Sequence, residues 1–246
     1  MTAWVRAAAD AAVAEVPGHA FRVLADAEST AGRYSLTEAT SPPGASVPPH
    51  VHRGAVECFY VLDGDYRLTV SGRVHEAGPG GFLLVPRGAA HQFEVVGSRP
   101  ARAVVIFSPA GFERVFRAMP DIFGTPGEPG PLWERANREQ DTGLLAPGEP
   151  HPPGPEAVSV AAPLATPVLT HTGLAISQRP LARGRVWAVG GEVCAVWVLG
   201  GALRVDTAAD SITARPGQLV TFEAGPARAV ALADATALLV LASSLD

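Results

Sequence analysis

Three histidines and one glutamate lie at spacings that suit a transition-metal site. His50 and His52 are separated by one residue, Glu57 follows shortly after, and His91 lies further along the chain. Alternate residues of an extended strand point to the same side, so His50 and His52 are expected to share a face. Imidazoles and a carboxylate together are ligands typical of a divalent transition metal such as Fe, Mn, Ni, Co, Cu or Zn. The pattern therefore predicts a site for one such ion.

Short strands broken by turns surround these residues. Short segments that read as strands occur at 33–39, 56–62, 66–70, 81–85, 91–96 and 101–107. The segments between them are rich in Gly, Pro, Asp and Ser, which are typical of tight turns. Strands this short and evenly spaced predict an all-β sandwich or barrel. Such a fold would bring the strand ends that carry the four residues close together.

The same residues fall within two motifs that resemble those of the cupin superfamily. The first reads Gly44-(5)-His50-x-His52-(4)-Glu57-(6)-Gly64, and the second reads Gly80-(5)-Pro86-x-Gly88-(2)-His91. Val95 stands where the second motif usually ends in Asn, a departure that touches no metal ligand. The resemblance implies a small double-stranded β-helix barrel with His50, His52, Glu57 and His91 as metal ligands inside it.

The first strand region recurs later in the chain at an offset of 137 residues. Nine of the 37 ungapped pairs from 59/196 to 95/232 are identical, including turn glycines. Repetition of strands and turns indicates two copies of one β domain. At this offset the four ligands are replaced by Trp187, Val189, Cys194 and Arg228, which do not form a transition-metal site. The chain therefore resembles a bicupin with one metal site and a degenerate second barrel.

The expected fold class is all-β, with two double-stranded β-helix (cupin or jelly-roll) barrels joined by a short helical and Pro-rich connector. The expected domains are an N-terminal cupin barrel with the metal site at 1–108, the connector at 109–170, and the degenerate C-terminal barrel at 171–246. Helical spacing occurs at 111–118 and 131–140, and seven prolines between 146 and 167 indicate a semi-rigid linker. The Ala-rich residues 1–16 predict one short helix.

The first domain resembles, over roughly residues 20–145, the quercetin 2,3-dioxygenase-like cupins. This resemblance implies a metal-dependent oxygenase that adds O₂ to a small aromatic or polyketide-like molecule. Two alternatives remain open: a non-redox isomerase, cyclase or lyase that uses the metal as a Lewis acid, and a non-catalytic ligand-binding bicupin. Glu57 is the candidate catalytic residue, either as a fourth ligand or as a base that takes a substrate proton. Phe59, Phe93 and Tyr34 are candidate pocket residues, with plain core packing as the alternative.

Composition and charge exclude several other classes. All 19 basic residues are arginine, the net charge is −5, and no basic stripe is present, so a nucleic-acid partner is not expected. No run approaches the roughly 18 apolar residues of a membrane span, and the N-terminus has no secretory pattern. We therefore expect a cytoplasmic protein, monomeric or homodimeric, whose partners are a small-molecule substrate and O₂. Cys58 and Cys194 are expected to be buried thiols without a disulfide framework.

Overall fold

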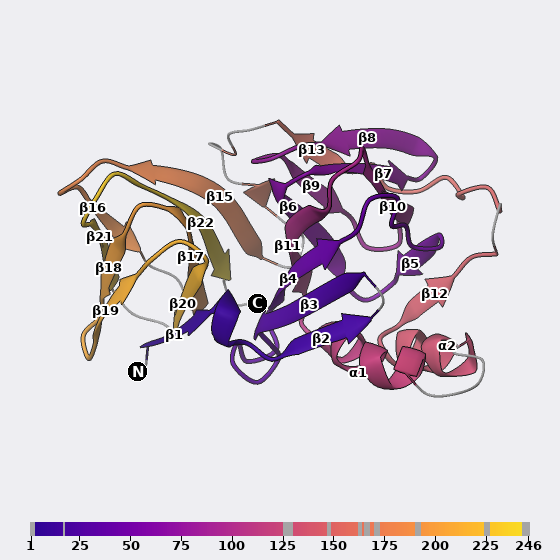
Figure 1. Ribbon diagram of the computed structural model, residues 1–246, viewed down its shortest axis with the longest axis horizontal. Helices are drawn as coiled ribbons and strands as arrows, with labels where there is room; N and C mark the ends of the chain where they lie inside the picture. Colours follow the sequence, from indigo (N-terminus) through magenta and orange to yellow (C-terminus); the bar gives the residue numbers. More distant parts are fainter. Residues whose placement is uncertain are drawn as a thin grey trace. The chain divides into compact units, whose positions relative to one another are not determined.

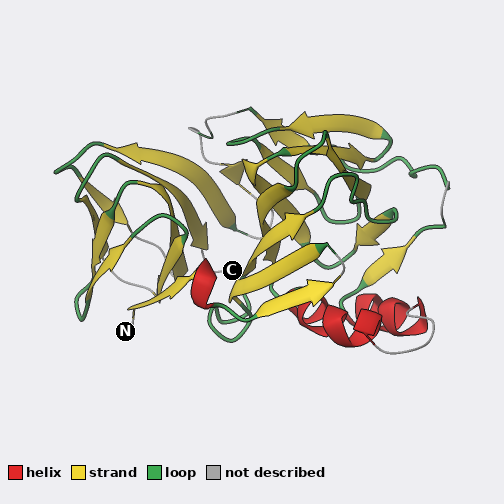
Figure 2. Cartoon of the chain, viewed as in Figure 1, coloured by secondary structure: helices red, strands yellow, loops and turns green. Residues whose placement is uncertain are grey.

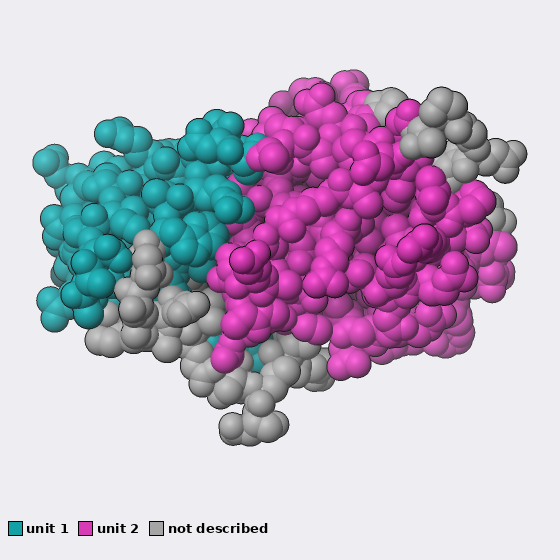
Figure 3. Space-filling model, turned by 90° about the horizontal axis from the view of Figure 1, so that it is seen from below, with its two compact units in different colours: residues 1–11, 164–246 teal, residues 12–163 magenta. Residues whose placement is uncertain are grey.

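Strands dominate the computed structural model, which describes residues 3–16, 18–124, 130–146, 149–161, 164, 168–169, 173–189, 193–223 and 227–242 (Figure 2). The chain divides into unit 1, residues 1–11 and 164–246, and unit 2, residues 12–163 (Figure 3). The predicted all-β class is confirmed. Neither helix in the described part of the chain has the length and apolar character needed to cross a membrane.

Unit 2 consists of two antiparallel sheets with two helices (Figure 1). One sheet has the order β13-β9-β6-β11-β4-β3-β2 and the other has the order β12-β5-β10-β7-β8. The elements are β2 (Val13–Val16), β3 (His19–Ala25), β4 (Ser35–Ser41), β5 (His50–His52), β6 (Val56–Asp63), β7 (Asp65–Val70), β8 (Arg73–Ala77), β9 (Phe82–Val85), β10 (Ala90–Val96), β11 (Ala101–Ser108), α1 (Glu113–Gly124), α2 (Gly130–Glu139), β12 (Thr142–Leu144) and β13 (Val158–Val160). One apolar core draws residues from both sheets.

Unit 1 also consists of two antiparallel sheets. Its sheets have the orders β1-β20-β17-β22-β15-β14 and β16-β21-β18-β19. The elements are β1 (Ala3–Ala7), the 3₁₀ turn η1 (Ala8–Asp10), β14 (Val168–Leu169), β15 (Leu174–Leu181), β16 (Val186–Val189), β17 (Val193–Gly200), β18 (Leu203–Asp206), β19 (Ser211–Ala214), β20 (Gln218–Glu223), β21 (Ala227–Ala231) and β22 (Ala235–Ala242). These two sheets also share one core.

The repeat read from the sequence corresponds to equivalent strands in the two units. β17 starts and ends 137 residues after β6, and each strand occupies the third place in its sheet. The turn glycines Gly64 and Gly201 both have positive φ, 71° and 74°. A Cβ on Gly64 would lie 2.7 Å from the Cα of Ala101, and one on Gly201 would overlap the backbone of Asp234. Both turns therefore require glycine for the same two reasons, conformation and space.

The N-terminal segment departs from the prediction. Residues 1–16 were expected to form one helix, but the structure shows β1, the short η1 turn and β2. β1 pairs with β20 of unit 1, and β2 pairs with β3 of unit 2. Alanine has the highest intrinsic helix propensity, but pairing with an existing sheet edge supplies hydrogen bonds that an isolated short helix lacks.

The connector also differs from a plain linker. Both predicted helices are confirmed, as α1 and α2, but both belong to unit 2 together with the barrel that precedes them. The Pro-rich stretch contains β13, which adds to the edge of β9 in unit 2. The expected boundaries at 108/109 and 170/171 therefore do not coincide with the division of the chain at residues 11/12 and 163/164.

Candidate metal centre

The structure brings all four predicted ligands together inside unit 2. His50 and His52 lie on β5, His91 lies on β10 directly opposite His50 in the antiparallel pair, and Glu57 comes from β6 in the facing sheet. The ligand atoms of the four side chains lie within 4.8 Å of one another. This spacing, and a donor set of three imidazoles and one carboxylate, suits one divalent metal ion.

Backbone carbonyls fix the ring orientation of two of the histidines. Nδ1 of His50 lies 2.9 Å from the carbonyl oxygen of Pro48, and Nδ1 of His91 lies 2.9 Å from that of Ala89. A carbonyl oxygen can only accept a hydrogen bond, so each Nδ1 carries the proton and donates it. In the neutral ring Nε2 then has a free lone pair, which is the atom that binds a metal.

A side chain from the connector does the same for the third histidine. Nδ1 of His52 lies 2.8 Å from Oγ1 of Thr142, and this hydroxyl donates to the carbonyl of Gln140 at 3.4 Å. Because the hydroxyl proton is used there, the hydroxyl accepts from Nδ1 of His52. Thr142 lies on β12, opposite His52 on β5. Thr142 could not be predicted from the sequence, because it follows His52 by 90 positions and belongs to no metal motif.

The centre of the cluster fits a cation. Nε2 of His91 lies 2.8 Å from Oε2 of Glu57, and Nε2 of His52 lies 3.3 Å from the same oxygen without forming a hydrogen bond. Lone pairs of imidazole and carboxylate repel at such distances unless a positive charge lies between them. One extra proton would satisfy a single pair of atoms, whereas a divalent ion would satisfy all four ligands at once.

Burial sets the protonation states that ligation requires. Burial lowers the pKa of His50 well below its ordinary value, helped by the nearby charges of His91 and His52, and it also lowers the pKa of His52. Burial alone would raise the pKa of Glu57, but the close imidazoles of His52 and His91 outweigh this effect and hold that pKa below its usual range. His50 and His52 are therefore neutral and Glu57 is ionised, as a metal site needs.

Replacing Thr142 with valine is expected to weaken metal binding by about 10-fold to 100-fold. Valine keeps the shape of threonine but cannot accept the hydrogen bond that orients His52, and loss of such outer contacts has effects of this size. Competition with a chromophoric chelator measures the affinity. Thr69→Val, on β7 outside the cluster, is the matched control. Equal affinities of the wild type and Thr142→Val would contradict the orienting role.

A cavity of about 540 Å³ opens onto the cluster. His50 and Glu57 reach into it, and most of its other lining side chains are apolar. Aromatic rings come from both sheets and both helices: Phe21, Phe59, Phe93, Phe112, Phe116 and Trp133. No arginine is among the described residues that line the cavity, and the chain contains no lysine. Such a wall suits a largely apolar, aromatic molecule.

The three predicted pocket residues have different positions. Phe59 and Phe93 line the cavity, with ring centroids 5.9 Å apart. The prediction that Tyr34 lines the pocket is wrong. Ala39 and Ser41 line the cavity, so the odd-numbered positions of β4 face it. Tyr34 lies on the other side by strand alternation and is fully buried there.

Helices α1 and α2 contribute more to the cavity than the sequence indicated. Phe112, just before α1, contacts Phe107 and the ligand His52, with ring centroids 4.4 and 4.8 Å away. Phe116 and Trp133 also line the cavity. The spacing along 111–118 predicts a helix, and the structure shows that Phe112 and Phe116 form part of the cavity wall.

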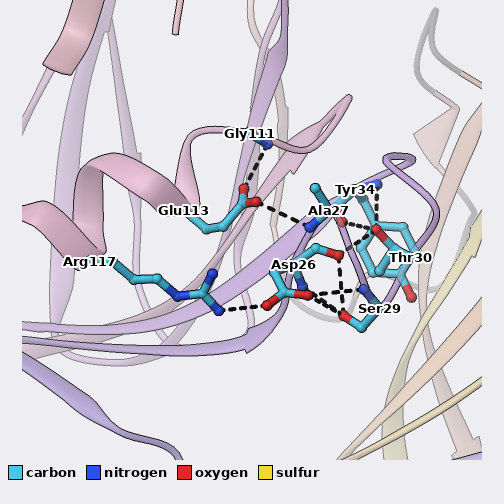
Figure 4. A network of polar contacts seen from close by, with 8 residues as sticks. All are labelled: Asp26, Ala27, Ser29, Thr30, Tyr34, Gly111, Glu113 and Arg117. Atoms are coloured by element: carbon cyan, nitrogen blue, oxygen red, sulfur yellow. Dashed lines mark hydrogen bonds and ion pairs between the residues drawn. The ribbon is translucent and has the colours of Figure 1, made fainter. Parts of the chain in front are cut away.

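Polar contacts fix α1 against the loop between β3 and β4 (Figure 4). Glu113 is buried and accepts hydrogen bonds from the backbone N–H groups of Ala27 and Gly111. One turn later, Arg117 forms an ion pair with Asp26 at 2.6 Å. Partial burial alone would raise the pKa of Asp26, but bonds from Arg117 and Ser29 outweigh it and lower that pKa to about 2. These contacts position the helix that carries Phe116.

Replacing Arg117 with methionine is expected to lower the free energy of unfolding at pH 7 by about 0.5–1 kcal/mol, because the ion pair is partly exposed. The folded-state pKa of Asp26 is depressed, so the pair stabilises the fold above about pH 4 and loses this effect as the pH falls towards 2. The variant should therefore differ less from the wild type at pH 2 than at pH 7. Urea unfolding at both pH values measures this, with the exposed Arg135→Met as control. If Arg117→Met lowered the free energy of unfolding equally at both pH values, the stabilising role of the ion pair would be contradicted.

Unit 1 places other side chains at the equivalent positions. Trp187 is half-buried and Val189 is buried against the core of unit 1, while the side chain of Cys194 lies outside the described part of the structure. Arg228 was expected to replace His91, but its side chain is exposed, and its neighbours Ala227 and Ala229 face inward. In unit 1, Trp187 pairs with Ala229 rather than with Arg228, so the pairing register differs from that of His50 and His91.

Comparison with known proteins agrees with this geometry. Residues 37–107 match the family model described as Cupin domain. No curated protein sequence matches the chain. Similar solved structures are an oxalate decarboxylase of Lactobacillus farciminis in complex with formate (TM-score 0.66, 12% identity, 98% of this chain and 86% of that chain) and protein YlbA of E. coli (TM-score 0.63, 12% identity, 97% and 90%). At these identities the likeness concerns the fold. The chain therefore contains a cupin domain, which carries all four residues of the cluster, within a fold shared with these structures.

Proposed function

We propose that the protein is a metal-dependent cupin oxygenase that acts on a small, largely apolar aromatic molecule. The observation that carries this proposal is the aromatic cavity of about 540 Å³ that opens directly onto His50 and Glu57. A quercetinase-like dioxygenase fits this arrangement, since it needs a metal beside a dry pocket for a flat substrate. The metal, when bound by the three histidines and Glu57, would supply the redox chemistry that joins O₂ to the substrate.

The residues around the cluster have separable tasks in this reaction. The apolar wall excludes water and holds a flat ring by stacking, and Phe59 and Phe93 lie on the barrel side of it. Glu57, an ionised carboxylate at the cavity end, is placed to take a proton from a substrate hydroxyl at Oε2. We propose this base role in addition to metal ligation.

The cavity lining favours this substrate class over a small dicarboxylate. Oxalate decarboxylases share the fold, but a small dianion needs cationic side chains or several hydrogen-bond donors around it. The described cavity residues include no arginine, and their aromatic rings cannot neutralise the negative charges of a dianion. The proposed substrate is therefore neutral and aromatic.

We further propose that the chain has one metal site, with unit 1 as a degenerate cupin barrel. Among the residues that the structure describes, the four residues of unit 2 are the group suited to a metal. The counterparts Trp187 and Val189 offer no ligand of this kind. A monomer or a homodimer is compatible with this arrangement and remains a prediction.

The test combines metal identification with O₂ uptake. Purified protein is analysed for metals and then reconstituted separately with Fe, Mn, Ni, Co, Cu and Zn. Each form is assayed with a panel of flavonols and related phenols under ¹⁸O₂. Uptake of O₂ with both ¹⁸O atoms in the product supports the dioxygenase. Substrate loss without O₂ uptake would support the isomerase, cyclase or lyase alternative, and binding without turnover would support the ligand-binding alternative.

A further inference from the structure

A polar pair interrupts the apolar wall of the cavity. His19 on β3 and Ser41 on β4 both line it, and Nδ1 of His19 lies 3.1 Å from Oγ of Ser41. Ser41 is almost completely buried, and its hydroxyl is also hydrogen-bonded to Tyr66. The serine is thus fixed from two sides and holds the imidazole in one orientation. No metal motif includes His19, and no function could be assigned to it from the sequence.

This pair lies at the end of the cavity remote from the metal cluster. On β11, Phe107 lies opposite Ser35 of β4 on one side and opposite Glu57 of β6 on the other. The metal cluster is therefore level with Ser35, the first residue of β4. Ser41 is the last residue of β4, six positions further, or roughly 20 Å along the strand. The cavity therefore has a metal-binding end and a second polar end.

Aromatic rings connect the two ends. Phe112 contacts His52 at 4.8 Å, Phe116 contacts Phe112 at 5.3 Å, Phe21 stacks on Phe116 at 4.8 Å, and His19 stacks on Phe21 at 6.0 Å, all between ring centroids. Phe21 and Phe116 are within 15° of parallel, and His19 and Phe21 are within 8°. A flat molecule lying along this wall would contact rings over its whole length.

The chemistry of the pair suits a neutral hydroxyl group. Within the described part of the chain, Nδ1 of His19 bonds to Ser41, whereas Nε2 has no hydrogen-bond partner. Burial lowers the pKa of His19, so the ring is neutral at pH 7 and can form one hydrogen bond through Nε2. The described residues that line this end include no arginine to pair with a carboxylate, whereas one imidazole nitrogen matches a phenolic or alcoholic hydroxyl.

We propose that His19, held by Ser41, binds a hydroxyl group on the far end of the substrate and thereby selects extended aromatic molecules with polar groups at both ends. This inference deepens the proposed function, since it assumes that the same cavity binds the substrate. His19 is a specificity residue and takes no part in the reaction at the metal. Single-ring phenols, which cannot reach both ends, are expected to be poor ligands.

Galangin and kaempferol test the proposal, because these two flavonols differ by one hydroxyl, on the ring remote from the chelating hydroxyl and ketone. Calorimetric titration of the metal-loaded protein without O₂ measures binding with no turnover. The wild type is expected to bind kaempferol about tenfold more tightly, the effect of one hydrogen bond in a buried site. In His19→Phe the ratio of kaempferol affinity to galangin affinity should fall to about one, because phenylalanine keeps an aromatic ring at this position but cannot form the hydrogen bond. His19→Gln, which can still reach the hydroxyl, should retain about a threefold preference.

The matched control is His75→Phe, on β8 and outside the cavity lining, which should keep the tenfold ratio. Equal affinity of the wild type for both flavonols, an unchanged ratio in His19→Phe, or no binding of either flavonol would each overturn the inference. Failure of the oxygenase proposal has a different signature. In that case O₂ uptake is missing for every metal, while the binding ratio still depends on residue 19.

Discussion

Replacing His50 and His52 together with alanine is expected to reduce bound metal from about one ion per chain to near none. The two imidazoles supply half of the ligand set, and both point their Nε2 atoms at the centre of the cluster. Only His91 and Glu57 would remain as ligands, and two protein ligands bind a metal ion weakly. Activity should be lost with the metal, because the redox chemistry belongs to the ion.

Elemental analysis of protein purified under identical conditions measures this result. His75→Ala, which removes a histidine outside the cluster, is the control and should retain about one metal per chain. Circular dichroism shows whether the variant is folded, so that loss of metal is separated from loss of structure. Retention of a full equivalent of metal in the double variant would contradict the assignment of the site. Two metals per chain in the wild type would contradict a degenerate unit 1.

The cluster could be predicted from the sequence because its geometry is largely local. His50 and His52 share a face by strand alternation, and Glu57 follows on the next strand. His91 required one long-range step, which the pairing of His91 with His50 provides. The motif spacing already encodes that pairing, since the turns around Gly64 and Gly80 fix the lengths of the strands between them.

Features that depend on packing between distant segments could not be predicted in the same way. Thr142 reaches His52 only because β12 adds to the edge of β5 after two helices. His19 meets Ser41 across the pairing of β3 with β4, and neither residue belongs to a motif. The local pattern placed Tyr34 on a possible pocket face, but which face of β4 points inward is decided by the rest of the sheet.

The N-terminal prediction failed for a related reason. The helix was predicted from the many alanines of residues 1–16. Residues 3–7 instead pair with β20, more than 200 residues away, and residues 13–16 pair with the nearby β3. The same principle limits the repeat. The offset of 137 aligns β6 with β17. In β21, however, Arg228 is exposed, although its counterpart His91 is buried. A comparison of residue types cannot reveal such a difference in strand register.

Replacing Glu57 with glutamine is expected to reduce turnover by about 10²-fold to 10⁴-fold while the metal remains bound at saturating concentration. Glutamine keeps the size of the side chain, and three imidazoles remain to hold the ion. What is lost is the ability of Oε2 to accept a proton, so kcat should fall much more than the affinity for substrate. Steady-state kinetics and metal analysis on the same samples separate these effects.

The matched control for this variant is Glu38→Gln. Glu38 is as deeply buried as Glu57, at 6% exposure, but it lies on the even-numbered face of β4, away from the cavity, and pairs with Arg102. Its replacement should leave kcat unchanged even if it costs some stability. Loss of metal in Glu57→Gln in proportion to lost turnover would assign Glu57 as a ligand alone. Unchanged kcat with metal bound would remove it from the reaction altogether, because a carboxylate that receives the substrate proton cannot be replaced by an amide without cost.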